Sequence, residues 1–301
     1  MGTAVPARSD ARSAVPARIL VVGDESKGGT RALVHQHAAW LAARGCAVDV
    51  VSDRDSSLAD RPADCVVVFG GDGSLLATAR RMGENQRPTL GINRGRLGFL
   101  TAFEQEHTEQ ALTMLLAGQL REESRLMFAC STVIPGSAPD GGTSLPVLGL
   151  NDVVVSRAAV GGIIAVRAWR GAAELATYRG DGLIVASATG STAYSMAAGG
   201  PVLAPDLDAL VLTPLASHTL SARPLVLPVG EGIDLEVVET GAKKYAYCQI
   251  DGQVQVQIPV GGRARLRPAA GRFRRLSSGP MHFFEVLRAK FGFTGMPRPP
   301  G

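Results

Sequence analysis

The sequence contains few cysteines and no long apolar runs. Its 301 residues include four cysteines, which lie far apart and form no C-x-x-C pair. This spacing indicates neither a disulfide framework nor a zinc site. No apolar run approaches the roughly 18 residues that are needed to cross a bilayer, and the N-terminus lacks the apolar segment of a signal peptide. We therefore predict a cytoplasmic protein that has no membrane partner.

Lysine is scarce as well. It occurs only at positions 27, 243, 244 and 290, so arginine supplies almost all of the basic residues behind the net charge of +4. In the densest basic stretch, Arg263, Arg265 and Arg267 alternate with Ala264 and Leu266, which is typical of the solvated face of a strand. No nucleic-acid-binding motif accompanies these arginines. We predict a solvated face and no nucleic-acid partner; a contact to a nucleotide or to a neighbouring subunit is the alternative.

The order of strand-like and helix-like segments predicts two domains after a disordered tail. Residues 1–17 are mostly Ala, Pro, Arg and Ser, which is typical of disorder. From 18 to 120, buried strands alternate with amphipathic helices, which predicts an α/β nucleotide-binding domain with a parallel sheet. From 121 to 274, short β-rich runs broken by Gly, Pro and Asp predict an antiparallel, β-sandwich-like domain. Residues 275–301 include a helix-like segment, Met281–Lys290, which we expect to pack back on the first domain.

Individual elements are also predicted. In the first domain, strands are expected at Arg18–Gly23, Cys46–Val51, Cys65–Phe69 and Thr89–Ile92, and helices at Thr30–Arg44 and Ser74–Arg80. In the second domain, strands are expected at Phe128–Ile134, Val147–Ser156, Gly162–Trp169, Leu183–Ser187, Ile233–Val238, Tyr245–Ile250, Val254–Ile258 and Ala264–Pro268.

Three glycines surround one carboxylate where a buried strand meets a helix. The strand is Cys65–Phe69, and the residues that follow are Gly70, Gly71, Asp72 and Gly73. Ligands of parallel sheets bind outside the carboxyl ends of the strands. Glycines let phosphates approach the backbone N–H groups, and the N-terminal end of the helix favours negative charge. This loop therefore indicates phosphoryl transfer.

The residues of the loop leave three roles open for Asp72. Its carboxylate can accept the proton of an attacking hydroxyl, an effect of about 10²–10⁴-fold. It can instead help to position the divalent cation that accompanies a nucleotide. It can also simply cap the following helix in a tight turn.

Further motifs follow along the chain in a fixed order. They are Gly91–Leu100, Leu150–Val153, Tyr178–Ser195, Gly199–Pro201, His218–Val226 and Asp251–Gln253. Together with the glycine loop, they resemble the NAD kinase family from about residue 18 to residue 292. The stretches Thr189–Ser195 and Arg223–Val226 are more specific than the glycine loop, which lipid kinases and, in similar form, phosphofructokinases share.

The resemblance implies an enzyme that phosphorylates the adenosine-ribose 2′-hydroxyl of NAD to give NADP. It implies that Asp72 accepts the proton of that hydroxyl and that Asn151 and Asp152 bind ribose and adenine. The implied NAD-binding residues are Asp72, Gly73, Asn151, Asp152, Arg179, Asp181, Thr192, Ala193, Tyr194, Ser195, Ala197 and Gln253. The implied loop for the phosphate donor contains Gly70, Gly71, Gly73 and Asn93.

Two positions depart from the pattern of the family. Ala188 stands where the family usually has proline, which loosens a turn, and Ala197 stands where it often has serine, which removes one hydroxyl contact to NAD. The resemblance also implies a Mg²⁺ ion carried largely by the nucleotide phosphates, with ATP or polyphosphate as donor, and a homodimer or homotetramer. A lipid or sugar kinase, or a non-catalytic NAD(P)-binding sensor, is the alternative.

Overall fold

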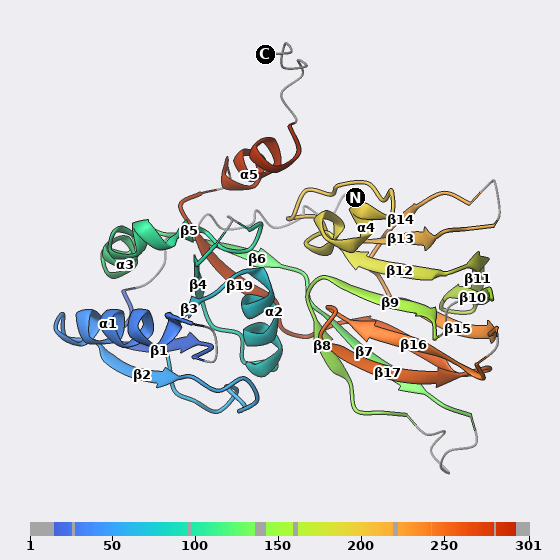
Figure 1. Ribbon diagram of the computed structural model, residues 1–301, viewed down its shortest axis with the longest axis horizontal. Helices are drawn as coiled ribbons and strands as arrows, with labels where there is room; N and C mark the ends of the chain where they lie inside the picture. Colours follow the sequence, from blue (N-terminus) through green and yellow to red (C-terminus); the bar gives the residue numbers. More distant parts are fainter. Residues whose placement is uncertain are drawn as a thin grey trace, which may run out of the picture. The chain divides into compact units, whose positions relative to one another are not determined.

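The computed structural model describes residues 15–25, 28–95, 98–135, 143–158, 162–218, 222–241, 243–279 and 281–292. Residues 1–14 of the predicted tail and residues 293–301 lie outside this part of the chain. The chain forms two compact units, which can be followed in Figure 1. The first contains the residues up to Thr78, Arg87–Ser124 and those from Arg274 onward, and the second contains Ala79–Gln86 and Arg125–Phe273.

The first unit is built on a sheet with parallel strand pairs. The strands are β1 (Arg18–Gly23), β2 (Ala47–Val51), β3 (Cys65–Phe69), β4 (Thr89–Asn93), β5 (Phe103–Glu104), β6 (Arg121–Arg125) and β19 (Phe273–Ser277). Their order is β2-β1-β3-β4-β19-β6, with β5 paired to β4. The pairs β1–β2, β1–β3, β3–β4, β4–β5 and β4–β19 are parallel. This confirms the predicted parallel-sheet α/β domain.

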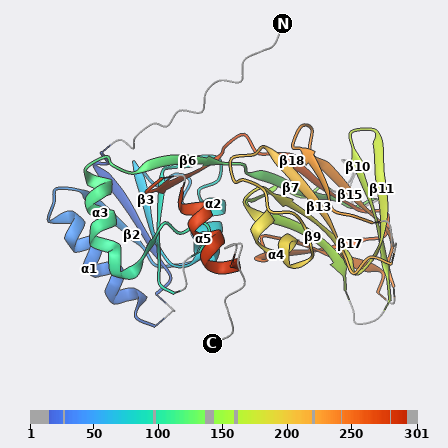
Figure 2. The same ribbon diagram turned by 90° about the horizontal axis from the view of Figure 1, so that it is seen from above.

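Helices cover both faces of this sheet, as Figure 2 shows. Helices α1 (Thr30–Ala42) and α3 (Thr108–Leu116), the latter preceded by the 3-10 turn η1 (Gln105–His107), bury their apolar residues with those of β1, β3 and β4. Helix α2 (Asp72–Arg81) lies on the opposite face. Its Leu75 sits over Gly91 of β4, where an added Cβ would meet the leucine at 2.7 Å.

The second unit is an antiparallel sandwich of two six-stranded sheets. One sheet has the order β11-β10-β15-β18-β7-β8 and the other β14-β13-β12-β9-β16-β17. The first sheet comprises β7 (Phe128–Val133), β8 (Val147–Gly149), β10 (Ile164–Arg170), β11 (Ala173–Gly180), β15 (Ile233–Glu239) and β18 (Arg263–Pro268). The second comprises β9 (Asp152–Arg157), β12 (Gly182–Ser187), β13 (Ala209–Leu215), β14 (Leu225–Pro228), β16 (Tyr245–Ile250) and β17 (Val254–Pro259).

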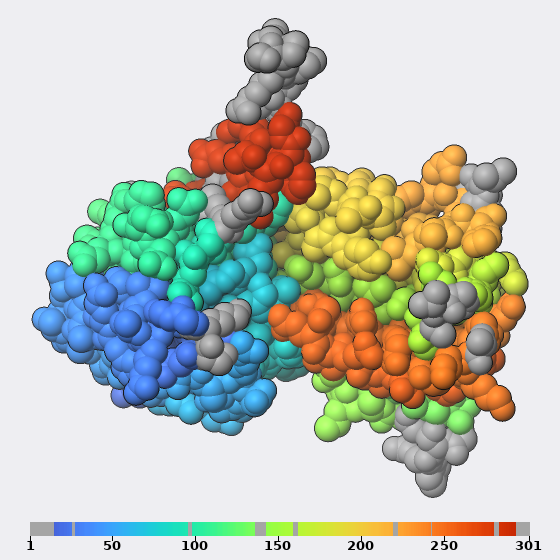
Figure 3. Space-filling model, in the orientation of Figure 1, coloured from blue at the N-terminus to red at the C-terminus, as the bar shows by residue number. Residues whose placement is uncertain are grey.

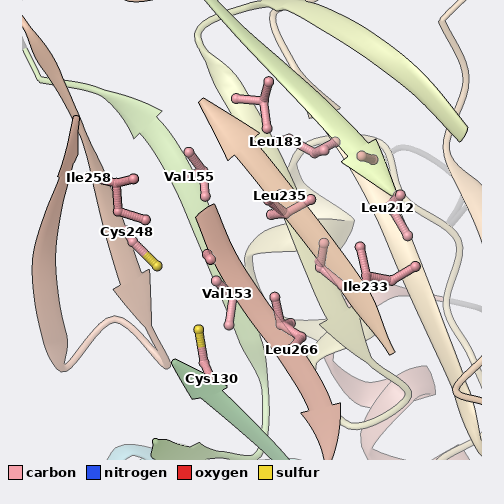
Figure 4. Close-up of a cluster of buried hydrophobic side chains, with 14 of the residues drawn as sticks. Cys130, Val153, Val155, Leu183, Leu212, Ile233, Leu235, Cys248, Ile258 and Leu266 are labelled. Atoms are coloured by element: carbon pink, nitrogen blue, oxygen red, sulfur yellow. The ribbon is translucent and has the colours of Figure 1, made fainter. Parts of the chain in front are cut away.

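The core of the sandwich is formed by side chains from the two facing sheets, as Figure 4 shows. Leu235 and Leu266 come from one sheet, and Val153 and Leu183 come from the other. All four side chains are fully buried. The predicted sandwich-like domain is therefore confirmed.

The arginines of β18 lie on the outer face of the sandwich, as the alternation predicted. Arg263 forms an ion pair with Glu236, and Arg265 and Arg267 form ion pairs with Asp234. The residues between them, Ala264 and Leu266, are buried. The carboxylates of β15 therefore neutralise this row of arginines, and this face of the sheet is partly solvated.

The last helix, α5 (Met281–Phe291), packs on a loop of the first unit. The ring of Phe99 lies 5.7 Å from that of Phe283 and 5.9 Å from that of Phe291, measured between centroids. The described end of the chain thus contacts the loop that follows β4. No helix among the described residues combines the length and the apolar character needed to cross a bilayer.

Candidate active site

The glycine loop joins β3 to α2 at the carboxyl end of the parallel sheet. An added Cβ at Gly70 would meet the Ser74 hydroxyl at 2.2 Å, so this position has no room for a side chain. Gly71 has open space on its Cβ side, and Gly73 is exposed. The helix begins at Asp72 rather than at the predicted Ser74. An acidic residue in the first turn of a helix is favoured by the helix dipole.

The Asp72 carboxylate is held by the backbone of the loop that follows β4. Oδ2 accepts a hydrogen bond from the N–H of Phe99 at 2.8 Å. Oδ1 accepts bonds from the N–H groups of Leu100 and Thr101, both at 3.1 Å, and from the Thr101 hydroxyl at 3.4 Å. Three consecutive N–H groups therefore fix the position of one carboxylate.

Asn93 and Thr101 shape this second loop. The Asn93 amide donates to the Thr101 hydroxyl at 3.1 Å, and its oxygen accepts the N–H of Gly95 at 2.9 Å. The Thr101 hydroxyl also accepts the N–H of Gly98 at 3.0 Å. Asn93 and Thr101 are buried. Asn93 thus holds the loop in shape, and a direct contact from it to the phosphate donor stays a prediction.

A second group of candidate residues lies in the sandwich, where three neighbouring strands of one sheet end together. Strand β9 is paired antiparallel to β12 on one side and to β16 on the other. Asn151 and Asp152 stand at the start of β9, Gly190 stands just after β12, and Asp251 and Gln253 follow β16. In an antiparallel sheet, the end of one strand lies beside the start of its neighbour, so these positions lie at the same end of the sheet. The β16–β17 hairpin that carries Asp251 is at the surface of the unit, in orange in Figure 3.

The Asn151 turn is packed tightly against the turn after β12. The Asn151 carbonyl accepts the N–H of Ser187 at 2.8 Å, and the Ser187 hydroxyl donates to the Leu150 carbonyl at 2.5 Å. An added Cβ at Gly190 would stand 2.0 Å from the Asn151 carbonyl oxygen. Gly190 is therefore required by this close approach of two backbones.

Asp152 is buried next to a second carboxylate. Its exposed fraction is 5%, and that of Asp251 is 8%. Burial, followed by the negative charge of Asp251, raises the pKa of Asp152 to about 7. Burial also raises the pKa of Asp251, against the opposing effects of its backbone hydrogen bonds and of Arg80. Perturbed carboxyls of this kind are enriched at functional sites.

The turn after β12 presents polar groups and one aromatic ring. It forms the 3-10 turn η2 (Gly190–Thr192) and the short helix α4 (Tyr194–Ala197). The Tyr194 side chain is 50% exposed, which leaves a face of its ring free to stack. The Thr192 hydroxyl donates to the carbonyl of Thr189 at 3.2 Å. Ala193 is half-buried beside them.

Sequence reasoning overlooked Thr189 and Arg80. The Thr189 hydroxyl is buried and has no hydrogen-bond partner in the described part of the chain. The Arg80 Nη2 atom donates to the Gln253 Oε1 atom at 2.6 Å, while its Nη1 atom is buried without a partner among the described residues. Buried polar groups of this kind call for a ligand or water. Thr189 belongs to the motif Thr189–Ser195 but was not singled out within it, and Arg80 belongs to no motif. The unsatisfied polar groups of both residues are visible only in the tertiary structure.

Comparison with known proteins identifies the family. The ATP-NAD kinase N-terminal domain matches residues 19–120, and the ATP-NAD kinase C-terminal domain matches residues 150–276. The chain belongs to the NAD kinase family. An NAD kinase from Heliobacterium modesticaldum is 37% identical over 280 residues, which cover 90% of this chain and 96% of that protein. An NAD kinase from Wolinella succinogenes is 40% identical over 230 residues, 76% of each protein.

Solved structures of this family share the fold. The crystal structure of yeast NADH kinase complexed with NADH matches with a TM-score of 0.84 at 20% identity, over 99% of this chain and 95% of that one. The crystal structure of an NAD kinase from Archaeoglobus fulgidus in complex with ATP matches with a TM-score of 0.72 at 26% identity, over 90% and 99%. The predicted resemblance to NAD kinases is confirmed.

Two residues that the NAD kinase resemblance assigns to the site lie elsewhere in the sandwich. Arg179, near the end of β11, forms an ion pair with Glu239 at 2.8 Å. Asp181, just before β12, forms an ion pair with Arg157 at 3.0 Å. Both residues precede β12, whereas Gly190 follows its end, and six strand residues span about 20 Å. Within one chain, the structure does not bring Arg179 and Asp181 together with Asn151 and Asp152.

Ser195 and Ala197 differ in accessibility. Ser195 is fully buried, and its hydroxyl forms a hydrogen bond with that of Thr213 at 2.8 Å. An added Cβ at Gly200 would meet the Ser195 hydroxyl at 2.3 Å, so the side chain is enclosed. Ala197 is exposed. Ser195 anchors α4 to β13, and a contact from either residue to NAD stays a prediction.

Proposed function

We propose that this member of the NAD kinase family transfers the γ-phosphoryl group of ATP to the 2′-hydroxyl of the adenosine ribose of NAD, giving NADP. The observation that carries the proposal is the Asp72 carboxylate, which three backbone N–H groups fix at the start of α2, beside the open backbone of Gly71. Family membership supports the same reaction.

Asp72 is proposed as the proton acceptor. Each oxygen of an ionised carboxylate accepts about two hydrogen bonds. Among the described residues, Oδ2 accepts a bond from Phe99 alone, so it retains capacity for the hydroxyl of the substrate. As the hydroxyl oxygen attacks the γ-phosphorus, its proton passes to this carboxylate oxygen, and the bond from the phosphorus to the leaving oxygen of the nucleotide breaks.

The end of the sandwich that carries Asn151, Asp152 and Tyr194 is proposed to bind the adenosine part of NAD. Asn151 offers an amide donor and acceptor for the adenine edge, and ionised Asp152 accepts from a ribose hydroxyl. Tyr194 offers a half-exposed ring for stacking. The buried, unpartnered hydroxyl of Thr189 supplies one further polar contact.

The residues of the chain fit a Mg²⁺ ion that is carried by the nucleotide. Among the described residues, no three His, Cys, Asp or Glu side chains gather into a metal cage. Mg²⁺ keeps several waters and is commonly bound through one or two carboxylates together with substrate phosphates. Because Asp72 is assigned here as the proton acceptor, the phosphates and water would hold most of the coordination positions of the ion. When bound, the ion neutralises the charge that develops on the phosphates.

Two alternative functions explain less. A lipid or sugar kinase that shares the glycine loop does not account for the match of residues 150–276 to the C-terminal domain of NAD kinases. A non-catalytic sensor of NAD(P) has no need for a carboxylate fixed at the phosphate loop.

A coupled assay tests the proposed function. The purified protein is incubated with ATP, NAD and Mg²⁺, and NADP is read out with an NADP-specific dehydrogenase. Parallel reactions replace NAD by NADH or diacylglycerol, and ATP by polyphosphate. We expect NADP to form with ATP and NAD. Phosphorylation of diacylglycerol without NADP would favour the lipid kinase, and NAD binding without turnover would favour the sensor.

Gly98 offers a steric test of the role of Asp72. An added Cβ at Gly98 would lie 1.9 Å from Asp72 Oδ1 and 2.4 Å from its Cγ. We expect Gly98→Ala to displace the carboxylate and to lower kcat by about 10²-fold, the typical cost of a 1 Å misplacement. Steady-state kinetics of NADP formation measures this. The matched control is Gly95→Ala in the same loop, where the nearest atom is 4.0 Å away. Equal kcat values for the two variants would contradict the proposed role.

A further inference from the structure

Asp251 makes an unusual set of backbone contacts for a residue of a hairpin turn. Its Oδ1 accepts the N–H groups of Asn151 at 2.7 Å and of Asp152 at 3.2 Å, and its Oδ2 accepts the N–H of Leu150 at 3.0 Å. Its own N–H donates to the Asp152 carbonyl at 2.9 Å. One carboxylate therefore binds three consecutive residues of the segment that carries the proposed ribose-binding pair.

The backbone of Asp251 is held in a conformation that L residues rarely adopt. Its φ is +51°, in the left-handed region, and Gly252 follows with a φ of +64°. A non-glycine residue in this region is strained and persists only where the surroundings compensate. At Asp251, the bonds to the Leu150–Asp152 backbone provide that compensation.

We propose that Asp251 is a positioning residue for NAD binding: its carboxylate folds the Leu150–Asp152 segment so that Asn151 and Asp152 face the substrate. The inference rests on the proposed function, because it takes Asn151 and Asp152 as residues that contact NAD. Asp251 itself acts through them.

The same carboxylate influences the charge of Asp152. The pKa of Asp152 is raised to about 7 by burial and then by the charge of Asp251. Arg80, from the end of α2, is the cation that faces Asp251. On the other side of β9, Asp152 pairs with Ala186 of β12, which is uncharged. Because the ionised form of Asp152 accepts the ribose hydroxyl, NAD binding strengthens as the pH rises through about 7.

Two substitutions separate the geometry from the charge. Asp251→Asn removes the negative charge but keeps one acceptor oxygen for the backbone N–H groups, so it tests the charge. Without the charge, the pKa of Asp152 falls, and the acidic limb of kcat/KM for NAD is expected to move to lower pH by about one unit. In an Asp152→Asn background, which has no titrating carboxyl at this position, Asp251→Asn should cause no such shift.

Asp251→Ala removes the acceptors as well. We expect KM for NAD to rise about 10-fold or more with a smaller change in kcat, and amide hydrogen exchange at residues 150–152 to become faster. The matched control is Asp60→Ala, the same substitution at an exposed turn position. If Asp251→Ala does not fold, Asp251→Asn still tests the inference. Its NH₂ group takes the place of the Oδ2 acceptor, so the Leu150 N–H loses its 3.0 Å bond and should exchange faster, while the pH profile reports the lost charge.

The test of Asp251 can fail independently of the test of NADP formation. Unchanged exchange at residues 150–152 in the folded Asp251→Ala protein, or an unmoved acidic limb in Asp251→Asn, would overturn the inference. Hydrogen exchange does not need turnover. A wild-type protein that forms no NADP would therefore reject the proposed function, while the exchange experiment still reports whether Asp251 holds the segment.

Discussion

Replacement of Asp72 by Asn is expected to lower kcat for NADP formation by about 10²–10⁴-fold, the range that is typical for the loss of a general base. The amide cannot accept the proton of the 2′-hydroxyl, whereas it keeps nearly the same shape. We expect the Kd for NAD to change little, because Asn151 and Asp152 are unaltered. Isothermal titration with NAD, next to single-turnover kinetics, separates the two effects.

The hydrogen bonds of Asp72 make a control necessary. One oxygen becomes an NH₂ group in Asp72→Asn and then faces a backbone N–H group, so the variant also disturbs the loop at Phe99–Thr101. Thr101→Val disturbs the same loop, since the Thr101 hydroxyl accepts from Asn93 and Gly98. It also removes the long bond from that hydroxyl to Asp72 Oδ1, but the carboxylate itself and its three backbone N–H donors remain. If Thr101→Val lowers kcat as much as Asp72→Asn does, Asp72 organises the loop and is no base.

The sequence predicts the fold of the first unit well because its central strands β1, β3 and β4 are buried on both faces. Strand β3 has the predicted bounds, Cys65–Phe69, and all five residues are buried. Such continuous apolar runs are typical of parallel strands. Strand β19 was missed. It lies about 180 residues after β4, its partner in the sheet, and no local pattern reveals a pairing over that distance.

The second unit shows where local patterns fail. The run Val147–Ser156 was predicted as one strand, but the structure breaks it into β8 and β9 at Leu150 and Asn151. The break exists because Asp251, about 100 residues later, binds the N–H groups of this segment. Strand β11 was also missed, since its eight residues are mostly exposed or half-buried without regular alternation.

The site residues were predicted from the motifs of the family, whereas their partners were not. Asp72, Asn151 and Asp152 stand at the ends of strands, where the motifs place them. Phe99 and Thr189 lie within the motifs Gly91–Leu100 and Thr189–Ser195, but the motifs do not say which atoms the Phe99 backbone and the Thr189 hydroxyl contact. Arg80 lies outside every motif. Their importance comes from tertiary contacts, which depend on the fold as a whole.

Arg275→Met is expected to destabilise the first unit by about 3–5 kcal/mol, the typical cost of removing one partner of a buried ion pair. Arg275 is 2% exposed. Its guanidinium donates to Glu123 at 3.0 Å and to the carbonyls of Leu100 at 2.7 Å and Thr101 at 3.5 Å. Methionine fills much of the volume, but it leaves the carboxylate and the carbonyls without these donors.

The neighbouring arginine of the same strand is the matched control. Arg274 forms two hydrogen bonds with Glu122, at 2.7 and 2.8 Å, but its side chain is 43% exposed. Exposed ion pairs contribute about 0–1 kcal/mol, so Arg274→Met should be nearly neutral. Urea unfolding measures the free energies, with Trp169→Phe as the background so that Trp40, in the first unit, is the fluorescent reporter. Equal destabilisation by Arg275→Met and Arg274→Met would show that the burial of Arg275 does not determine its contribution to stability.

Arg275 also links stability to catalysis. The carbonyls that it binds belong to Leu100 and Thr101, whose N–H groups hold the Asp72 carboxylate. Arg275→Lys keeps the charge but lacks the planar set of five donors, so it cannot satisfy the carboxylate and both carbonyls together. We therefore expect the lysine variant to recover part of the stability while kcat remains reduced. A lysine variant with full kcat would show that Asp72 is held in place without Arg275.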